Sequence, residues 1–380
     1  MKIGIIGGGI AGLVAAIACA RHGFDVTIYE AADAFGDVGA GIQLSPNATF
    51  ILRNLGCDLD SLSAMRPAET VLFNRNERML MRMPHDQSPN APYLQVYRPD
   101  LVSMLADNAS ALDVKVYFQA EASGKKKDDQ FVISVNEQSE AFDILVHADG
   151  VNSAARSNAE GRRGSGVAWR ALVPGDTAPK KYLDGPRIFL GPRKHLVTYP
   201  LRDGASINIV ALEDQSKDAK FGWSNSRDVD AFRALFSPVF PKARDLFGQV
   251  AEVKQWALVS DRRAKMDDKN GAPIIGDATL AMPPFMAQGA AMAIEDAMRL
   301  ADDIAQGYKG WSDASRMFRA RRKQDIMRAA IRNGSLFHFY PPVLGPIFHV
   351  GMWTTGRLCP QFLVRRYAWI YDFRHDFIAS

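Results

Sequence analysis

The sequence of 380 residues predicts a mixed α/β (α+β) fold, in which a unit built on a parallel sheet is interleaved with an antiparallel β-sheet. Two observations predict it. A strand, a glycine-rich turn, an alanine-rich helix and a second strand open the chain, and alternating apolar and polar runs occupy residues 73–97 and 166–261. No change in composition marks a linker between the two parts, so we expect them to be intertwined along the chain.

The amino-acid composition excludes several classes of protein. Hydrophobic residues make up 47% and charged residues 23%, which excludes a disordered or collagen-like chain. The net charge is only +4 and no basic face stands out, so we expect no nucleic-acid partner. Cys19, Cys57 and Cys359 are widely spaced, which argues against disulfides or a metal site and favours the cytoplasm. Residues 3–20 are uncharged, but glycines interrupt them, and we expect no integral membrane segment.

The N-terminal unit contains a GxGxxG motif between two strands. Residues 2–6 form the first expected strand, and Gly7-Gly8-Gly9-Ile10-Ala11-Gly12 follows. In this motif Gly7 allows a tight turn, Gly9 lets the backbone approach a pyrophosphate, and Gly12 lets the helix from Ala11 to about His22 pack closely. A second strand, 24–29, ends at Glu30 and Ala31, about 20 residues after Gly9, where a carboxylate accepts hydrogen bonds from a ribose. The order predicts a Rossmann-like site and does not separate FAD from NAD.

Two distant segments complete a series of motifs. In residues 142–156, an apolar strand is followed by Asp149-Gly150 and then by Ser153 and Arg156. In residues 273–297, Gly276-Asp277 follows an expected strand, and Gly289-Ala290 begins an expected helix. With GxGxxG, these segments resemble the three fingerprints of the class A, single-component flavoprotein monooxygenases. The resemblance implies bound FAD, with the first motif and Glu30 on its ADP half, Asp149 on FAD and the reduced nicotinamide, and Asp277 on the ribityl chain or pyrophosphate.

Further segments resemble one branch of this family. Residues 39–47 resemble the segment beside the isoalloxazine, which assigns Gly41 and Ile42 to FAD, and 97–101 resemble the segment whose arginine, here Arg98, reaches FAD. Residues 167–173, 195–201 and 369–372 resemble salicylate hydroxylase and 6-hydroxynicotinate 3-monooxygenase. The resemblance implies an FAD-binding domain at 1–72, 98–165 and 262–330, a substrate domain at 73–97 and 166–261, and a C-terminal cap or interface at 331–380.

One position departs from the family pattern. The third motif usually reads GDAxH, and here Leu280 holds the position of the histidine. Leucine neither donates a hydrogen bond nor titrates. This departure keeps open the hypothesis that the chain binds flavin without hydroxylating anything.

The chemistry that the resemblance implies uses NADH or NADPH and O2. Reduced FAD forms a C4a-hydroperoxide, which transfers OH to an electron-rich ring, while the protein orients the ring and helps a phenol lose its proton. His195 and Tyr199 are four residues apart on one expected strand and so share a face, which makes them candidates for this task, against the alternative of a core histidine and a packed tyrosine. Gln288 is a candidate to bind substrate or flavin, or to cap a turn.

Three charged or aromatic features have open interpretations. Arg170 pairs either with a substrate carboxylate or, as we favour, with a surface acid. The basic run 316–332 is expected to be a solvated helix face, with a phosphate or acidic-lipid site as the alternative. The aromatic segment 337–377 is a cap, a subunit interface or a lipid-touching patch, and its interspersed charges favour the first two.

The leading hypothesis is therefore an FAD-dependent, NAD(P)H-consuming monooxygenase of a small aromatic or heteroaromatic acid, acting as a monomer or homodimer. The alternatives are a hydroxylase of a larger apolar ring, such as a quinone precursor or polycyclic natural product, and a flavin-binding protein that has lost the activity.

Overall fold

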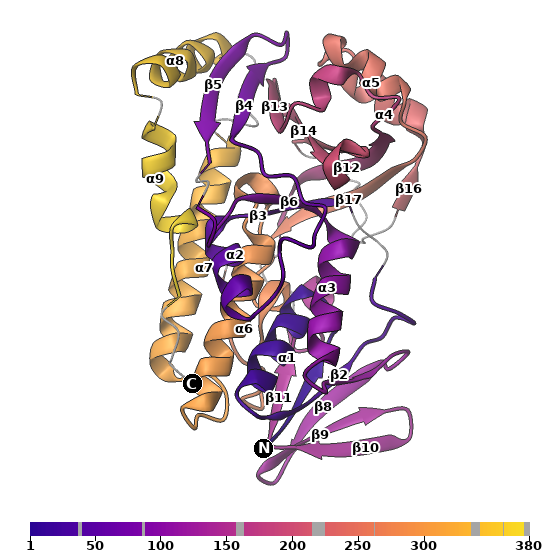
Figure 1. Cartoon of the computed structure of the whole chain (residues 1–380), viewed down its shortest axis with the longest axis vertical. Helices are drawn as coiled ribbons and strands as arrows, with labels where there is room; N and C mark the ends of the chain where they lie inside the picture. The colour runs from indigo at the N-terminus through magenta and orange to yellow at the C-terminus, as the bar shows by residue number, and fades with distance from the viewer. Residues whose placement is uncertain are drawn as a thin grey trace.

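The computed structural model describes residues 1–36, 40–85, 88–156, 163–214, 225–261, 263–335, 343–359 and 361–375. Of the segments singled out above, Gly39 lies outside these ranges, as do residues 337–342, 360 and 376–377 of the aromatic segment and residues 86–87 and 215–224 of the alternating runs. A parallel sheet with its helices forms one end of the molecule, and a large mixed sheet forms the other (Figure 1). The predicted α/β class is confirmed.

The parallel sheet has the strand order β11-β1-β2-β7. Its strands are β1 (Lys2–Ile6), β2 (Asp25–Tyr29), β7 (Lys115–Tyr117) and β11 (Ile144–His147). On one face lie α1 (Ile10–Arg21), α3 (Arg98–Ser110) and α6 (Gly289–Ala305), which share one hydrophobic core with β1 and β2. The strands predicted at 2–6 and 24–29, and the helix between them, are confirmed within about a residue.

A small antiparallel sheet covers the other face of the parallel sheet. It consists of β8 (Ala122–Lys127), β9 (Gln130–Val135) and β10 (Gln138–Phe142). Its Ile133 and Phe142 pack against Leu145 of β11 and Tyr29 of β2 in a second cluster. Parallel strands need cover on both faces, and this sheet supplies it where a classical doubly wound fold would place helices.

The larger sheet has eight strands in the order β16-β17-β12-β15-β14-β13-β4-β5. Their bounds are β4 (Glu69–Asn74), β5 (Met79–Pro84), β12 (Arg163–Pro174), β13 (Arg187–Gly191), β14 (Lys194–Leu201), β15 (Ser206–Glu213), β16 (Asn225–Arg227) and β17 (Val253–Ser260). The strands predicted around 187–190, 196–201 and 206–212 lie in it. On its outer face Trp169 and Ala171 pack on α4 (Val229–Phe236) and α5 (Arg244–Gly248). Alternation therefore turns Ala168 and Arg170 to the inner face, toward the parallel sheet.

Two further features join the halves. The strands β3 (Gly41–Leu44) and β6 (Leu94–Tyr97) pair as a two-stranded ribbon, which passes between the two large sheets (Figure 1). Arg202, after β14, forms a bidentate pair with Asp100 of α3, at 2.9 and 2.6 Å. The boundaries of the two domains stay a prediction.

Of the remaining helices, the last three line one side of the molecule (Figure 1), and the first packs in the core with α6. They are α2 (Pro46–Asn54), α7 (Asp313–Asn333), α8 (Gly345–Leu358) and α9 (Phe362–Tyr371). Ile370 of α9 packs on Ile326 and Ala330 of α7, and Met352 of α8 packs on Leu80 and Met81 of β5. Among the described residues, no helix is both long and apolar enough to span a membrane.

Candidate active site

The three sequence motifs converge at the carboxyl ends of β1 and β11. Gly7, after β1, is so close to β11 that an added Cβ would lie 2.5 Å from the carbonyl oxygen of Ala148. The segment before Gly276 runs parallel to β11, because the His147 amide donates to Pro273 and the Ile275 amide to His147. An added Cβ on Gly276 would lie 2.9 Å from the Cβ of Ala11. The sites predicted from three separate parts of the sequence thus lie together.

The glycines of the first motif have different surroundings. Gly7 has φ +105°, a conformation that side chains rarely adopt. Gly12 contacts the turn so closely that an added Cβ would be 1.9 Å from the oxygen of Gly7, which fixes α1 against β1. Gly9, the N-cap of α1, has no protein atom within 4 Å of an added Cβ. The helix N-terminus is thus open to a ligand, and its amides and dipole favour a phosphate.

Glu30 closes the other side of this turn. Its Oε2 accepts a hydrogen bond from the Gly8 amide at 2.6 Å, and its Oε1 accepts one from the Ala32 amide at 2.9 Å. The side chain is therefore oriented by the backbone, while each oxygen keeps a second lone pair for a ribose hydroxyl. Ala31 is exposed beside it.

Two aspartates continue the site. The Oδ2 of Asp149 accepts a hydrogen bond from the Ala154 amide at 3.3 Å, and its buried Oδ1 has no partner in the described part of the chain. Asp277 receives no hydrogen bond on its carboxylate from any described residue. Burial raises the pKa of Asp277, against the nearby charges of Lys323 and Arg156. Both carboxylates therefore have acceptor capacity to spare.

The α6 N-terminus faces Asp277. An added Cβ on Gly289 would lie 4.0 Å from Oδ1 of Asp277, and Ala290 follows in the first turn of α6. The Arg156 guanidinium donates to the carbonyl oxygen of Asp277 at 3.1 Å and also pairs with Asp261. Orphaned carboxylate oxygens, an open helix end and a glycine turn suit the hydroxyl and phosphate groups of a dinucleotide, so the residues present fit FAD.

Arg98 and Gly41 lead from this cradle to the large sheet. Arg98, the first residue of α3, lies within electrostatic range of Asp277 and Glu30; burial lowers its pKa and the two carboxylates oppose this. The Gly41 amide donates to Oδ1 of Asn208 on β15 at 3.0 Å. Half-buried Ile42 follows Gly41 in β3. The ribbon segment predicted to lie beside the flavin is thus hydrogen-bonded to the inner face of the sheet.

His195 and Tyr199 both lie on the inner face, as their spacing predicts. The ring of Tyr199 covers Gly41, since an added Cβ there would be 2.4 Å from the ring and 2.7 Å from the hydroxyl. His195 is buried, with its ring centroid 5.7 Å from that of Phe285. Burial raises the pKa of Tyr199 well above its usual value, so its phenol stays protonated and is a hydrogen-bond donor at neutral pH.

Arg170 shares this face, and the expectation that it pairs with a surface acid is wrong. Its guanidinium lies over the ring of Trp256, with 4.4 Å from Cζ to the centroid. Its Nε is buried without a hydrogen-bond partner, and no described residue forms an ion pair with it. Burial lowers the pKa of Arg170, and the Tyr199 hydroxyl lies in its surroundings. A half-buried cation without an ion-pair partner is costly, so the site is suited to an anion.

The side chain of Gln288 is hydrogen-bonded to residues at the start of α2 and does not cap a turn. Its Nε2 donates to the Ser45 hydroxyl at 2.8 Å, and its Oε1 accepts from Asn47 Nδ2 at 3.1 Å. The same Asn47 nitrogen donates to Glu295 at 2.7 Å. Gln288 precedes α6 without capping it through its side chain, and it ties α6 to the start of α2. Its role as a catalytic residue stays a prediction.

The basic run on α7 is only partly solvated, which corrects the expectation of a solvated face. Arg321 and Arg328 are exposed, whereas Arg319, Arg322 and Lys323 are buried against α6. The buried three pair with Glu295 and Asp296, and Lys323 also donates to the carbonyl oxygen of Gly276 at 3.0 Å. Sequence spacing gave no signal for these pairs, because their acids lie on another helix.

Sequence reasoning missed three side chains around this face. Asn208 stands out in hindsight as an amide within the apolar strand 206–212. Tyr371, in the quoted C-terminal segment 369–372, donates its hydroxyl to the carbonyl oxygen of Met286 at 3.2 Å. Burial raises the pKa of Tyr93, and the nearby phenols of Tyr371 and Tyr199 raise it further. Tyr93 carried no recognisable sequence signal.

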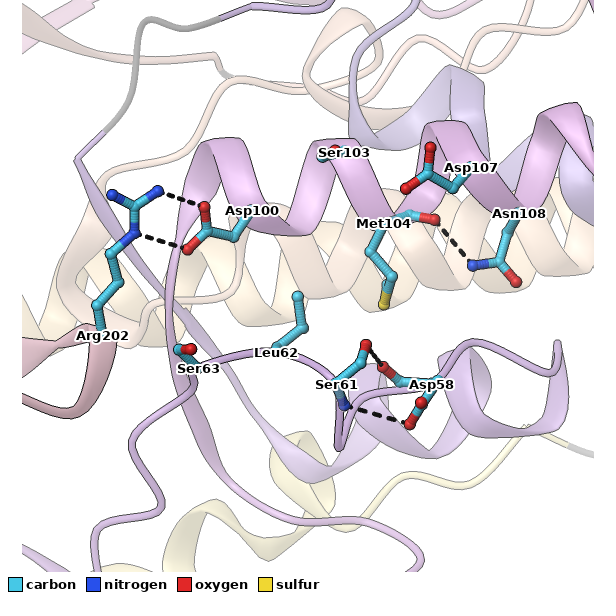
Figure 2. A pocket seen from close by; sticks show the side chains of 10 residues that line it. All are labelled: Asp58, Ser61, Leu62, Ser63, Asp100, Ser103, Met104, Asp107, Asn108 and Arg202. Carbon is cyan, nitrogen blue, oxygen red and sulfur yellow. Dashed lines mark hydrogen bonds and ion pairs between the residues drawn. The ribbon is translucent and has the colours of Figure 1, made fainter.

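Two further features are Leu280 and a surface cleft. Leu280 is buried, with 1% of its surface exposed. A cleft of 550 Å³ opens between α3, the loop 58–63 and Arg202 (Figure 2). Its lining includes Asp58, Asp100 and Asp107, and the one lining arginine is engaged by Asp100. An acidic lining repels phosphates, so this cleft does not suit a dinucleotide.

Comparisons with known proteins agree with this geometry. A family described as FAD binding domain matches residues 1–333. The chain is 30% identical to a 3-amino-4-hydroxybenzoate 2-monooxygenase of Streptomyces platensis, over 100% of this chain and 98% of the relative. It is 29% identical to a 6-hydroxynicotinate 3-monooxygenase of Bordetella bronchiseptica, over 87% and 91%. Its fold resembles a salicylate hydroxylase substrate complex, with a TM-score of 0.78 at 19% identity over 98% and 95%.

Proposed function

Because this chain belongs to the FAD-binding family of aromatic-ring monooxygenases, we propose that it hydroxylates a small aromatic or heteroaromatic acid. The reaction consumes NAD(P)H, O2 and a proton; one oxygen atom enters the ring as a hydroxyl group and the other leaves as water. Bound FAD supplies the redox chemistry, taking a hydride from the nicotinamide and activating O2. The chain itself binds, orients and moves protons.

Binding of the cofactor is assigned to the convergent motifs. The open N-terminus of α1 at Gly9 would face the pyrophosphate, and Glu30 would accept from the ribose. Asp149 and Asp277 would accept hydrogen bonds from the rest of the FAD, and Gly41 and Ile42 would lie beside its ring system. No second parallel nucleotide-binding sheet occurs among the described residues, so the nicotinamide cofactor is proposed to dock transiently.

Proton handling is assigned to the inner face of the sheet. Tyr199 is a protonated donor at neutral pH, and it is held in place by contact with Gly41. His195 lies four residues away on the same face and is proposed to take the proton of a substrate hydroxyl. Removing that proton makes the ring more electron-rich, which favours attack on an electrophilic oxygen.

The observation that carries the proposal is the half-buried Arg170, whose buried Nε has no hydrogen-bond partner in the described part of the chain. A carboxylate placed against it would restore charge balance and accept two hydrogen bonds. The two relatives described above are named for substrates that are hydroxylated aromatic carboxylates, which supports the same class here. The substrate carboxylate is thus proposed to pair with Arg170, on the face of the sheet that also carries His195 and Tyr199.

The first experiment is anaerobic reduction of the bound flavin by NADH and by NADPH. Hydroxylated benzoates and nicotinates are added in turn, each beside its neutral carboxamide. Acceleration by one acid, together with a hydroxylated product in air, would establish the substrate class and the preferred donor. NAD(P)H oxidation without any hydroxylated product would instead support the flavin-binding protein without hydroxylase activity, which Leu280 keeps open.

Arg170→Gln tests the carboxylate contact. Loss of a buried charge partner costs about 2–5 kcal/mol, so KM for the acid should rise by roughly 30-fold or more, while KM for the carboxamide changes little. Arg187→Gln is the matched control, because Arg187 also lies over a ring, that of Phe73, but has its own partner in Asp184. An equal effect of Arg170→Gln on acid and carboxamide would refute the assignment.

The location is proposed on separate grounds. Cys19, Cys57 and Cys359 are all free thiols, which suits a reducing compartment, and NAD(P)H is supplied there. We therefore propose that the enzyme is cytoplasmic. Its proposed oligomeric state is a monomer or a homodimer.

A further inference from the structure

The helix α8 presents a broad apolar side to solvent. Its inner side is fixed on the edge strand β5, where Met352 and Phe348 pack on Leu80 and Met81, and an added Cβ on Gly356 would lie 3.2 Å from the Leu80 oxygen. On the opposite side, the exposed fractions are 69% for Ile347, 62% for Val350 and 81% for Leu358. We call this set the α8 apolar side: Ile347, Val350, Trp353 and Leu358 of the helix, with Val343 and Leu344 directly before it.

The position of α8 leaves this side without a packing partner among the described residues. In Figure 1 the helix lies at the outer corner of the molecule, beside β5 and away from the parallel sheet. Clusters of large exposed apolar side chains on a soluble surface mark a contact with another apolar phase or molecule. Single exposed apolar residues need no such explanation, but here they recur along one helix.

The charged residues within α8 and α9 are all arginines. Residues 343–369 contain Arg357, Arg365 and Arg366 and no aspartate or glutamate. Arg357 lies over the ring of Trp353, with 5.0 Å from Cζ to the centroid, and all three arginines are exposed. Burial lowers the pKa of His349, so this residue stays neutral and adds no competing charge.

From this pattern we infer that α8 and α9 dock on the surface of an anionic phospholipid bilayer. The helix α8 would lie in the plane of the interface, with its apolar side among the acyl chains and the arginines at the phosphates. This inference goes beyond the proposed function, since none of the residues involved belongs to the candidate active site.

Charge complementarity favours lipid over a second copy of this chain. In a two-fold contact centred on α8, the same surface meets itself, so Arg357 and its like-charged neighbours would face each other without an acid in the segment to neutralise them. An anionic bilayer supplies the missing negative charge. Tryptophan beside arginine is also the side-chain combination that suits the headgroup region.

The docking surface is already formed. The inner side of α8 is held by β5, and α9 is held by Arg322, which donates to the carbonyl oxygens of Trp369 and Ile370 at 3.0 and 3.1 Å. Binding would therefore not have to order these helices. The free energy gained by burying the apolar side chains in the bilayer would be reduced little by loss of conformational entropy.

Vesicle flotation of the full-length, FAD-loaded protein tests the inference. Vesicles of phosphatidylcholine with about a third phosphatidylglycerol should carry the protein, and pure phosphatidylcholine vesicles should carry much less. The double variant Ile347→Glu/Val350→Glu should abolish flotation. Met317→Glu is its control, because Met317 is an equally exposed apolar residue, at 72%, on α7. Arg365→Gln/Arg366→Gln should weaken binding by about 30-fold, at about 1 kcal/mol for each arginine.

Three results would overturn the inference. One is the absence of flotation on the anionic vesicles, and another is flotation that Ile347→Glu/Val350→Glu leaves unchanged. The third is a dimer, seen by light scattering, that the same double variant converts to a monomer while lipid binding is absent, which would mean that a second copy covers α8. Flotation requires no turnover, so failure here is separable from failure of the proposed reaction.

Discussion

The guanidinium of Arg322 on α7 donates to both carboxylate oxygens of Glu295 on α6, from Nε at 2.7 Å and from Nη2 at 2.9 Å. Burial alone would raise the pKa of Glu295, but Arg319 and Arg322 hold it below its usual value, so the carboxylate stays ionised. Arg322 also holds α9, and Glu295 also accepts from Asn47 at the start of α2. One buried pair therefore connects the flavin-side helices to the C-terminal helix.

Arg322→Met is expected to be strongly destabilising. It leaves Glu295 short of a partner and releases two carbonyl oxygens of α9, and breaking a buried pair costs about 3–5 kcal/mol. Chemical denaturation measures the loss. Arg321→Met is the control at the neighbouring position, because the Arg321 side chain is 86% exposed and lies 4.0 Å from its acid. A loss for Arg322→Met no larger than for Arg321→Met would show that the pair does not hold the helices together.

The glycines of the first motif should separate folding from cofactor binding. An added Cβ at Gly9 meets no protein atom, so Gly9→Ala should fold normally and yet bind FAD more weakly, because the methyl group enters the phosphate position. An added Cβ at Gly12 would be 1.9 Å from the Gly7 oxygen, so Gly12→Ala should itself lower stability. Thermal unfolding of the apoproteins and flavin titration measure both effects. Equal flavin affinity of Gly9→Ala and the wild type would place the pyrophosphate elsewhere.

Local motifs made the nucleotide end predictable from sequence, because a strand, a glycine turn and a helix are specified by neighbouring residues. The same holds for His195 and Tyr199, whose even spacing alone puts them on one face. Arg170 and Arg322 were misjudged because the group that decides their environment lies far away in the sequence. Trp256 lies under Arg170, and Glu295 pairs with Arg322 across two helices. Burial of a charge is a property of the packing and leaves no local signal.

Gly41→Ala should disturb the substrate side of the site. An added Cβ would overlap the Tyr199 ring at 2.4 Å, and both residues are fixed in paired strands, so the ring must move. We expect a rise in KM for the aromatic acid and a loss of coupling between NAD(P)H oxidation and product. Gly248→Ala is the control, since no atom lies within 4 Å of its added Cβ. Unchanged KM and coupling in Gly41→Ala would exclude Tyr199 as a group that positions the substrate.

His85 should make stability depend on pH in the acid range. Its ring is stacked on Tyr93, with centroids 3.8 Å apart and planes inclined by 3°, and its Nε2 lies 2.8 Å from the Thr70 hydroxyl. Burial lowers the pKa of His85 from 6.5 to about 4, so the unfolded chain takes up a proton at a higher pH than the folded one. The stability present above pH 6.5 is therefore lost as the pH falls toward 4, by up to about 3 kcal/mol.

Urea unfolding at a series of pH values measures this loss. Carboxylates contribute to the same range, so the quantity to compare is the difference between the wild type and His85→Gln, which keeps a polar group near Thr70 but does not titrate. The difference should grow steadily in favour of His85→Gln from pH 6.5 to pH 4 and be constant above it. Parallel curves across the whole range would mean that His85 accepts a proton as easily in the folded protein as in the unfolded chain, and that the stack on Tyr93 is open to water.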